Sequence, residues 1–231
     1  MNIKYNLSKL KGKIIAIDGP AGSGKSTTAK IIADRLGYTY LDTGAMYRAL
    51  TYYALKNNIN PSDGEGLANV MTGLTINFEN KNDSQHVFLG DEDITTAIRT
   101  PEVTRQVSEV SAHKKIREVM VEKQKELGNK GSIVAEGRDT TTVVFTNAHL
   151  KIYLRASIEE RAQRRLIDLT KMGVTTSLKE IQDDIERRDN YDSNREHSPL
   201  TIAPDAIVID TSNLSIEDQV EKIISMAIDK F

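Results

Sequence analysis

The feature that most restricts the possible folds of this chain is a glycine-rich segment near its N-terminus. Residues 19–26 are Gly-Pro-Ala-Gly-Ser-Gly-Lys-Ser, which matches the pattern G-x-x-x-x-G-K-[ST]. The segment follows an apolar run, Ile14 to Ile17, and precedes Lys25 to Leu36, where apolar residues recur at helical spacing. Glycines let successive backbone N–H groups turn inward around phosphate oxygens, and a helix N-terminus adds positive potential. The order of strand, loop and helix therefore predicts a phosphate-binding loop.

The side chains at the end of this segment suit a nucleoside triphosphate. Lys25 can reach the β- and γ-phosphates, and the Ser26 hydroxyl can coordinate Mg²⁺. A glycine-rich turn with a solvated lysine is the alternative, but it does not explain the strand before the segment or the helix after it. We expect ATP to bind here together with Mg²⁺. The expected ATP-binding residues are Gly19, Pro20, Ala21, Gly22, Ser23, Gly24, Lys25, Ser26 and Thr27.

The rest of the chain alternates predicted strands with predicted helices. Helical patterns occupy Ala45 to Asn57 and Glu102 to Leu127, and Gly37 is expected to end the first helix. Ser157, Ser177 and Ser215 each precede an acid by three residues, which predicts three helix starts. The remaining predicted strands are Tyr38–Leu41, Ser132–Ala135, Leu150–Leu154 and Ala206–Ile209. This alternation predicts an α/β fold, a three-layer P-loop sandwich with a five-stranded parallel sheet.

Residues 61–100 differ from this pattern. Asn, Asp and Gly are frequent there, and two short strand-like runs occur, Leu74 to Phe78 and His86 to Leu89. We interpret the region as a small β-containing insertion. The prediction is one domain over residues 1–231, with a core of about 1–60 and 101–231 and an insertion of about 61–100.

Composition excludes several classes of protein. The 231 residues carry a net charge of −2, which gives no long-range attraction to nucleic acid or an acidic membrane. The absence of cysteine excludes disulfides and thiol chemistry, and the four histidines lack the spacing of a transition-metal site. No apolar run approaches transmembrane length, and Met1 to Lys11 lacks a signal-peptide core. We expect a cytoplasmic monomer that binds neither nucleic acid nor a membrane.

A phosphate-binding loop alone does not separate a kinase from a GTP-driven switch. The switch motifs D-x-x-G and N-K-x-D occur literally, as residues 63–66 and 80–83. However, D-x-x-G should end a strand of the sheet, whereas Asn57 to Ser62 is polar and contains Pro61. The two motifs also leave space for only about one short strand between them. We therefore interpret both as loops rich in Asp, Asn and Gly.

Several further segments resemble the cytidylate kinase family, in the family's order and over almost the whole chain. They are Asp18–Thr27, Leu41–Arg48, Gly90–Ile94 with Ile98–Thr100, Glu136–Asp139, Arg161–Arg165, Arg187–Asp189, Asp192–Arg195 and Ser198–Leu200. The resemblance implies transfer of the γ-phosphoryl group of ATP to CMP or dCMP. It also implies that the insertion is an acceptor-binding lobe and that residues of about 157–200 form a lid.

The resemblance also implies roles for individual residues. Ser108 and Asp139 match positions that bind the cytosine edge, and Asp192 matches the position that holds the sugar hydroxyls. Arg161 and Arg165, four apart on one helix face, match lid residues that cover the donor phosphates. The residues that match positions handling phosphates or the acceptor are Thr43, Arg48, Arg117, Arg138, Arg188 and Arg195. The set expected to act in catalysis is Lys25, Arg48, Arg138, Arg161, Arg165 and Arg188.

Two alternative functions stay open at this point, a different small-molecule kinase on the same scaffold and a nucleotide-binding regulatory protein without turnover. Two structural alternatives stay open as well. The charged residues from Arg161 to Arg195 could form an exposed helix pair that is solvated, and Asp139 could form a structural ion pair with Arg138 or a lid arginine. The chain also departs from the family after Arg138-Asp139. Thr140 and Thr141 stand where an apolar residue and Gly are usual, and Thr146 stands where Pro is common. These departures are expected to alter the turn beside Asp139.

Overall fold

The computed structural model describes residues 7–81, 84–171 and 173–231, which form two compact units. The first unit contains the described residues of Met1–Asp42, Leu127–Asn194 and Ser198–Phe231. The second contains the described residues of Thr43–Glu126 together with Arg195–His197.

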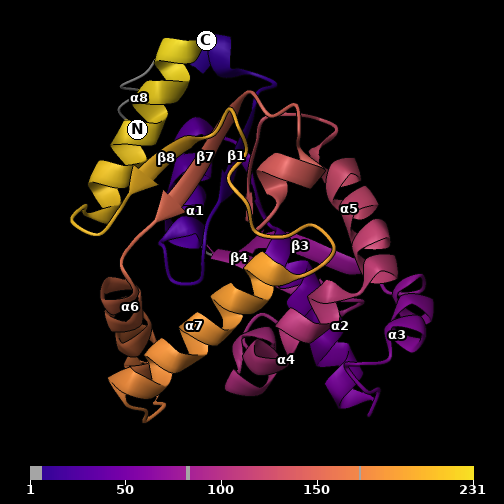
Figure 1. The fold of residues 1–231 in the computed structure, drawn as a ribbon. Helices are drawn as coiled ribbons and strands as arrows, with labels where there is room; N and C mark the ends of the chain where they lie inside the picture. Colours follow the sequence, from indigo (N-terminus) through magenta and orange to yellow (C-terminus); the bar gives the residue numbers. More distant parts are fainter. Residues whose placement is uncertain (1–6, 82–83, 172) are drawn as a thin grey trace. The chain divides into compact units, whose positions relative to one another are not determined.

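The first unit is built on a five-stranded sheet in which every neighbouring pair is parallel, as the sequence predicted (Figure 1). Its strand order is β2-β6-β1-β7-β8. The strands are β1 (Ile14–Asp18), β2 (Thr39–Asp42), β6 (Ile133–Gly137), β7 (Leu150–Arg155) and β8 (Ile207–Asp210). Since all five run the same way, the loops that follow them leave from one edge of the sheet, where α/β folds bind their ligands.

Two helices of this unit, α1 (Lys25–Leu36) and α8 (Ile216–Lys230), share a buried apolar core with the sheet. The predicted end of α1 is confirmed, because Gly37 adopts a left-handed conformation with φ of 65°. The predicted caps are confirmed as well. Ser157, Ser177 and Ser215 each accept a hydrogen bond from the backbone N–H three residues on, at 3.1 to 3.2 Å.

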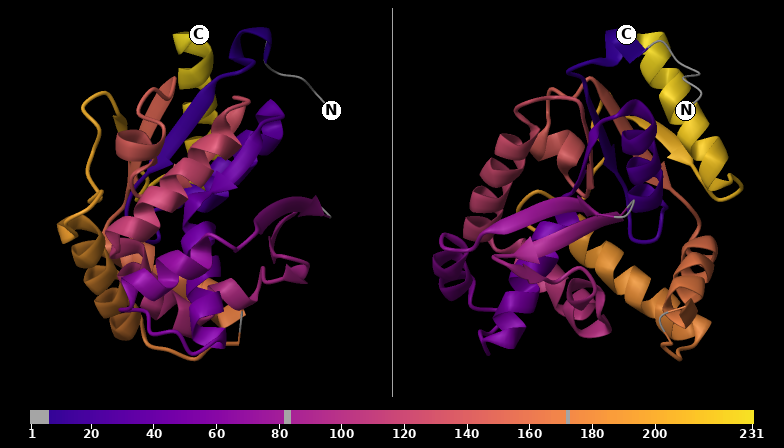
Figure 2. Two further views of the ribbon diagram at one scale, coloured as in Figure 1. Left: turned by 90° about the vertical axis from the view of Figure 1, so that its right-hand side faces the viewer. Right: turned by 180° about the vertical axis from the view of Figure 1, so that it is seen from behind.

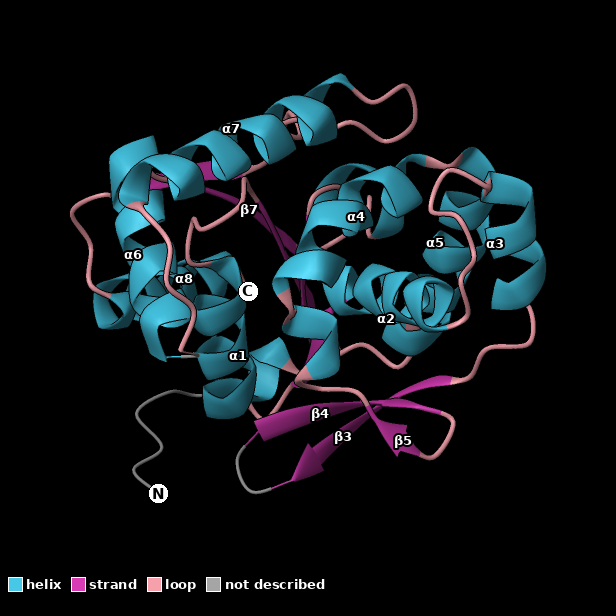
Figure 3. Ribbon diagram, turned by 90° about the horizontal axis from the view of Figure 1, so that it is seen from below, coloured by secondary structure: helices cyan, strands magenta, loops and turns pink. Residues whose placement is uncertain are grey.

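The helices α6 (Ile158–Lys171) and α7 (Leu178–Asn194) pack on each other through an apolar cluster of their own (Figure 3). Ala162, Leu169, Ile181 and Ile185 form its buried part. Two short elements complete the unit, η1 (Leu7–Leu10) and η3 (Thr140–Val144), and η3 is a single turn of π-helix. The sequence did not predict η3.

The second unit combines helices with a three-stranded antiparallel sheet in the order β3-β4-β5, which is labelled in Figure 3 and drawn in purple to magenta in Figure 2. Its strands are β3 (Ile76–Lys81), β4 (Ser84–Leu89) and β5 (Glu92–Asp93). Its helices are α2 (Thr43–Lys56), α3 (Gly64–Met71), η2 (Ala97–Arg99), α4 (Pro101–Ala112) and α5 (Lys114–Gly128), whose last two residues belong to the first unit. The two predicted insertion strands are thus confirmed, and they pair with each other.

Two predictions about this unit were wrong. Asp63 to Gly66 is not a loop but the start of α3, where the Asp63 carboxylate accepts a hydrogen bond from the Gly66 N–H at 2.9 Å. The helix predicted over 102–127 is interrupted at His113, whose backbone is extended with ψ of 124°. No Pro or Gly marks this break, and the His113 ring instead contacts the Pro61 carbonyl at 2.8 Å.

The second switch-like motif begins in β3, which lies in the antiparallel sheet and not in the parallel one. Residues 82 and 83 of that motif lie outside the described residues. In the part of the chain that the structure describes, no helix combines the length and apolar character needed to cross a bilayer.

Candidate functional site

The predicted phosphate-binding loop leaves the carboxyl end of β1 and enters α1 at Lys25. Gly19 and Gly22 both have positive φ, at 152° and 75°. A Cβ on Gly19 would collide with the Leu154 carbonyl oxygen of β7, so the loop can lie this close to the sheet only without a side chain there. Gly24 has positive φ as well, at 93°, so three glycines of the segment adopt the conformations with which phosphate-binding loops turn their N–H groups inward.

Lys25 is buried beneath this loop. Its Nζ donates to the Pro20 carbonyl at 2.7 Å and to the Ser23 hydroxyl at 3.4 Å. Burial lowers the pKa of Lys25, and the neighbouring Arg138 guanidinium acts in the same direction. A desolvated ammonium held by the loop is placed to meet a phosphate charge.

Ser26, the next residue, donates a hydrogen bond from its hydroxyl to Glu136 Oε1 at 2.6 Å. Glu136 lies on β6, and its register partner on β2 is Asp42. Both carboxylates are buried. Burial raises the pKa of Glu136, and the charge of Asp42 adds to that effect. A hydroxyl beside carboxylates is the oxygen donor set that Mg²⁺ prefers, so these residues fit the ion that accompanies ATP.

Glu136 was not among the predicted site residues. The signal available for it was its place directly after the predicted strand Ser132–Ala135, as the first residue of the segment Glu136–Asp139 that resembles the family. Its partner Ser26 is 110 residues away, and only the pairing of β6 beside β1 brings the two together. Within the described residues, no group of three or more His, Cys, Asp or Glu side chains is arranged to hold a metal ion by itself.

Arg138 and Asp139 follow β6, the strand next to the one that carries the phosphate-binding loop. Arg138 Nε donates to Asp192 Oδ2 of α7 at 2.8 Å, in an ion pair whose carboxylate is buried. The predicted phosphate-handling arginine and the predicted sugar-binding acid are therefore partners. Asp139 is buried too, and its backbone carbonyl accepts from the N–H groups of Val143 and Val144 at 2.9 and 3.3 Å.

Arg161, in the first turn of α6, bonds directly to the phosphate-binding loop. Its guanidinium donates to the Ala21 carbonyl at 3.0 Å and pairs with the carboxylate of Asp189 on α7. Asp189 in turn accepts from the Ala21 N–H at 3.1 Å. Arg161 is only 8% exposed, which rules out the alternative of a solvated surface charge for this residue. Arg165, one turn further along α6, and Arg188, beside Asp189 on α7, are half-buried.

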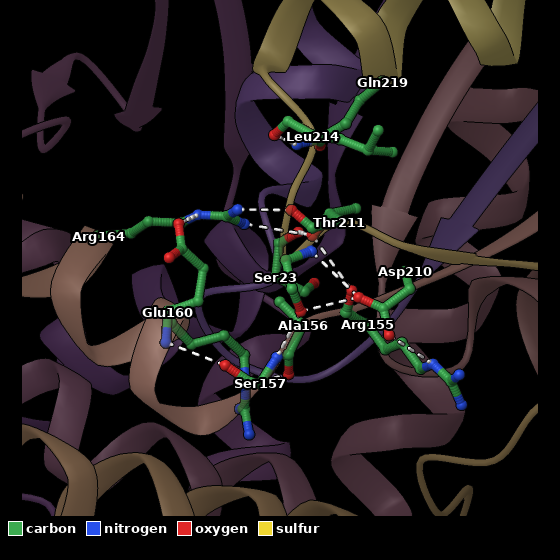
Figure 4. A network of polar contacts seen from close by, with 12 residues as sticks. Ser23, Arg155, Ala156, Ser157, Glu160, Arg164, Asp210, Thr211, Leu214 and Gln219 are labelled. Atoms are coloured by element: carbon green, nitrogen blue, oxygen red, sulfur yellow. Dashed lines mark hydrogen bonds and ion pairs between the residues drawn. The ribbon is translucent and has the colours of Figure 1, made fainter.

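Arg164 also touches this region, and sequence analysis did not single it out. Its guanidinium donates to the Thr211 side-chain oxygen at 3.2 Å and to the Thr211 carbonyl at 2.7 Å (Figure 4). The Thr211 hydroxyl donates to the Ser23 carbonyl at 3.2 Å. This network ties the segment after β8 and the helix α6 to the phosphate-binding loop. The partners are 47 and 188 residues apart, so no local pattern could have revealed them.

The second unit holds the other predicted acceptor residues. Thr43 begins α2, and Arg48 lies just over one turn further along that helix. Ser108 is buried on α4. Arg117, on α5, is buried with its guanidinium carbon 5.3 Å from the centre of the Tyr47 ring, and it donates to the Ser111 carbonyl at 2.9 Å. Arg195 is buried and lies in the short segment that joins this unit. The unit thus brings α2, α4 and α5 together around Arg117.

These features define a P-loop phosphotransferase. They are the parallel sheet in this strand order, the glycine-rich loop over a buried lysine, and the arginines at the adjoining strand and helix ends. The family model of cytidylate kinase matches residues 15–229. The chain belongs to the cytidylate kinase family.

Individual relatives agree with this assignment. A cytidylate kinase from Lysinibacillus sphaericus is 49% identical over 216 residues, which cover 94% of this chain and 96% of that protein. One from Bacillus cytotoxicus is 48% identical over 212 residues, which cover 92% and 94% respectively. A solved structure of an uncharacterized protein from Eubacterium ventriosum shares the fold, with a TM-score of 0.52, 13% identity, and coverage of 96% of this chain and 100% of that one.

Proposed function

We propose that this protein transfers the γ-phosphoryl group of ATP to CMP or dCMP, giving CDP or dCDP, in pyrimidine nucleotide metabolism. The observation that carries the proposal is the pairing of β1 with β6, in which Asp18 is the register partner of Gly137. The phosphate-binding loop follows the first strand and Arg138-Asp139 follows the second, so donor and acceptor elements leave adjacent strand ends. Membership of the cytidylate kinase family supports the choice of acceptor.

Phosphoryl transfer needs placement and charge neutralisation more than covalent chemistry. Lys25 and the loop N–H groups would hold the donor phosphates, and Arg161 and Arg165 would cover them from α6. Mg²⁺ bound with ATP would neutralise part of the phosphate charge. Ser26 and Glu136, which are hydrogen-bonded to each other, would hold that ion. We infer that α6 and α7 act as a lid that excludes water, so that the acceptor and not water receives the phosphoryl group.

The acceptor roles follow the family pattern. In the first unit, Arg138 and Arg188 would bind phosphate. Asp139 would bind the cytosine amino group, and Asp192 would bind a sugar hydroxyl. In the second unit, Ser108 would complete the base edge, and the residues proposed to bind the acceptor are Thr43, Arg48, Arg117 and Arg195. We also propose that the protein is a cytoplasmic monomer that acts on small nucleotides. Its net charge of −2 gives no long-range attraction to nucleic acid or a membrane, and we propose neither as a partner.

A panel of nucleoside monophosphates with ATP and Mg²⁺ tests the function directly. We expect phosphorylation of CMP and dCMP well above UMP, AMP and GMP. Turnover of a different small molecule would show another kinase on the same scaffold. ATP binding without turnover of any acceptor would show a regulatory protein.

Arg48→Met separates acceptor from donor binding. Loss of a charge-assisted contact to the monophosphate should weaken CMP by about 2 to 4 kcal/mol and leave ATP binding nearly unchanged. The measurement is Kd for each nucleotide by calorimetry. Arg105→Met, on the exposed face of α4, is the matched control and should change neither value. Equal weakening of CMP and ATP would show that Arg48 is not an acceptor clamp.

Asp192→Ala tests the sugar contact. If Asp192 accepts from the 2′-hydroxyl, kcat/KM for CMP should fall about tenfold further than that for dCMP, which lacks this group. Both acceptors should lose some activity, because the change also releases Arg138 from its ion pair. Asp192→Asn, which keeps an acceptor oxygen, should recover part of the difference. Parallel losses for CMP and dCMP would point to the 3′-hydroxyl or to a purely structural role.

A further inference from the structure

Asp18, the last residue of β1, is a buried carboxylate with an unusually full set of donors. Its side chain is 0% exposed. Oδ1 accepts from the Thr140 N–H at 2.9 Å and from the Thr140 hydroxyl at 2.6 Å. Oδ2 accepts from the Thr141 N–H at 2.7 Å and from the Thr141 hydroxyl at 2.6 Å. Two consecutive residues thus bind both oxygens of one carboxylate, each through its backbone and its side chain.

The two threonines are also, with Thr146, among the positions at which this chain departs from the family pattern. An apolar residue and Gly, which are usual there, would offer Asp18 their backbone N–H groups alone. Here the two hydroxyls double the number of donors, and both threonines are buried at 0% and 1% exposure. The two threonines at these positions therefore add side-chain hydrogen bonds to Asp18 and are not a neutral substitution.

The threonines fix the turn that carries Asp139. Asp139 directly precedes them, and its carbonyl accepts the two N–H groups that close η3. At the other end, Asp18 directly precedes Gly19, the first residue of the phosphate-binding loop. The bonds from Asp18 to Thr140 and Thr141 therefore join the strand that carries the donor loop to the residue that would bind the base.

The hydrogen bonds from the threonines offset part of the cost of burying the Asp18 carboxylate. Burial raises the pKa of Asp18, the hydrogen bonds from Thr140 and Thr141 oppose that rise, and the charge of Asp139 adds to it. Removing a hydroxyl would leave a buried carboxylate oxygen with one fewer donor, close to a second carboxylate. Movement of the turn would relieve this, and Asp139 would move with it.

We propose that Thr140 and Thr141 are positioning residues for base recognition, holding Asp139 at a fixed place relative to the donor loop by binding Asp18. The inference rests on the proposed function, in which Asp139 binds cytosine. It assigns specificity in this chain to two residues that themselves touch no substrate.

The test uses valine and serine variants of each threonine. Valine keeps the shape of threonine and removes the hydroxyl, whereas serine keeps the hydroxyl. Thr140→Val and Thr141→Val should each raise KM for CMP about five- to tenfold and narrow the preference for CMP over UMP, with KM for ATP changed by less than about twofold. Thr140→Ser and Thr141→Ser should stay near the wild-type values. The measurements are kcat and KM for CMP, UMP and ATP, with Tm for every variant.

Thr142→Val is the matched control from the same turn. The Thr142 hydroxyl is buried and has no hydrogen-bond partner among the described residues, so its loss should leave KM for CMP unchanged. If one valine variant fails to fold, the other valine variant is tested in the same way, with the Kd for CMP measured by calorimetry beside KM.

The outcomes separate this inference from the proposed function. Equal use of CMP and UMP by the wild type would overturn both. A wild type that prefers CMP, with valine variants that lose only Tm, would overturn the positioning role alone. So would an equal rise in KM for CMP and for ATP, since that would reflect a general distortion of the strand ends.

Discussion

Lys25→Ala is expected to lower kcat by about 10³-fold or more while the protein stays folded. The buried ammonium donates to the Pro20 carbonyl and the Ser23 hydroxyl, so it lies within the loop that would hold the phosphates. Its positive charge would be needed most when charge builds up on the transferring phosphoryl group. The measurement is steady-state turnover with CMP and ATP, beside Tm and circular dichroism.

Two variants control for the change in volume and charge. Lys25→Met keeps most of the side-chain bulk in a buried site, so it should preserve Tm better than alanine and lose as much activity. Lys30→Ala, on the exposed face of the same helix, should leave kcat near the wild-type value. A folded Lys25→Ala protein with near-normal turnover would contradict the assignment of residues 19–26 as the donor cradle.

Much of the parallel sheet could be predicted because its strands are short, apolar and separated by clear stop signals. The Ile14 to Ile17 run and Gly37 are examples, since the first can only be buried and the second supplies a left-handed helix end. The capping serines were predictable for the same reason, because a cap and its partner lie three residues apart. Local chemistry decides all of these features.

Features that depend on distant partners could not be predicted. The break at His113 lies in an unbroken helical pattern and is stabilised by a contact to Pro61, 52 residues earlier. The helix α3 was missed for a different, local reason. Gly64 and Gly66 have low helix propensity and suggested a loop, and they outweighed the capping signal of Asp63, three residues before Gly66.

The candidate site likewise contains some features that the local sequence predicts and others that depend on distant partners. The phosphate-binding loop has a contiguous motif, and Lys25 and Ser26 follow from it directly. The pairing of Glu136 with Ser26 and of Arg164 with Thr211 depends on which strands and helices become neighbours. Resemblance to a family gave Arg138 and Asp192 separate roles, but only the fold shows that they form one ion pair.

Asp139→Ala should narrow the preference for CMP over UMP by about 10³-fold, chiefly by reducing kcat/KM for CMP. Cytosine presents a 4-amino donor beside the N3 acceptor, whereas uracil presents the O4 acceptor beside an N3 donor. An ionised carboxylate can only accept hydrogen bonds, so it favours the amino group and repels O4. Ser108 can both donate and accept, so it would complete the base edge without enforcing the choice. The burial of Asp139 makes the discrimination strong, because a poorly matched base would leave a desolvated carboxylate without its partner.

Asp139→Asn distinguishes a base-binding role from a structural one. Asparagine has nearly the same shape, but its amide offers a donor as well as an acceptor. If Asp139 binds the base, this variant should retain part of its CMP activity and gain in kcat/KM for UMP relative to Asp139→Ala, since the amide N–H can meet O4. If Asp139 served only as a structural charge near Asp18, alanine and asparagine would lower Tm and reduce CMP and UMP use in parallel. Arg138 pairs with Asp192, and a change in the ratio of CMP to UMP use at an unchanged Tm is the result that a purely structural ion pair of Asp139 would not produce.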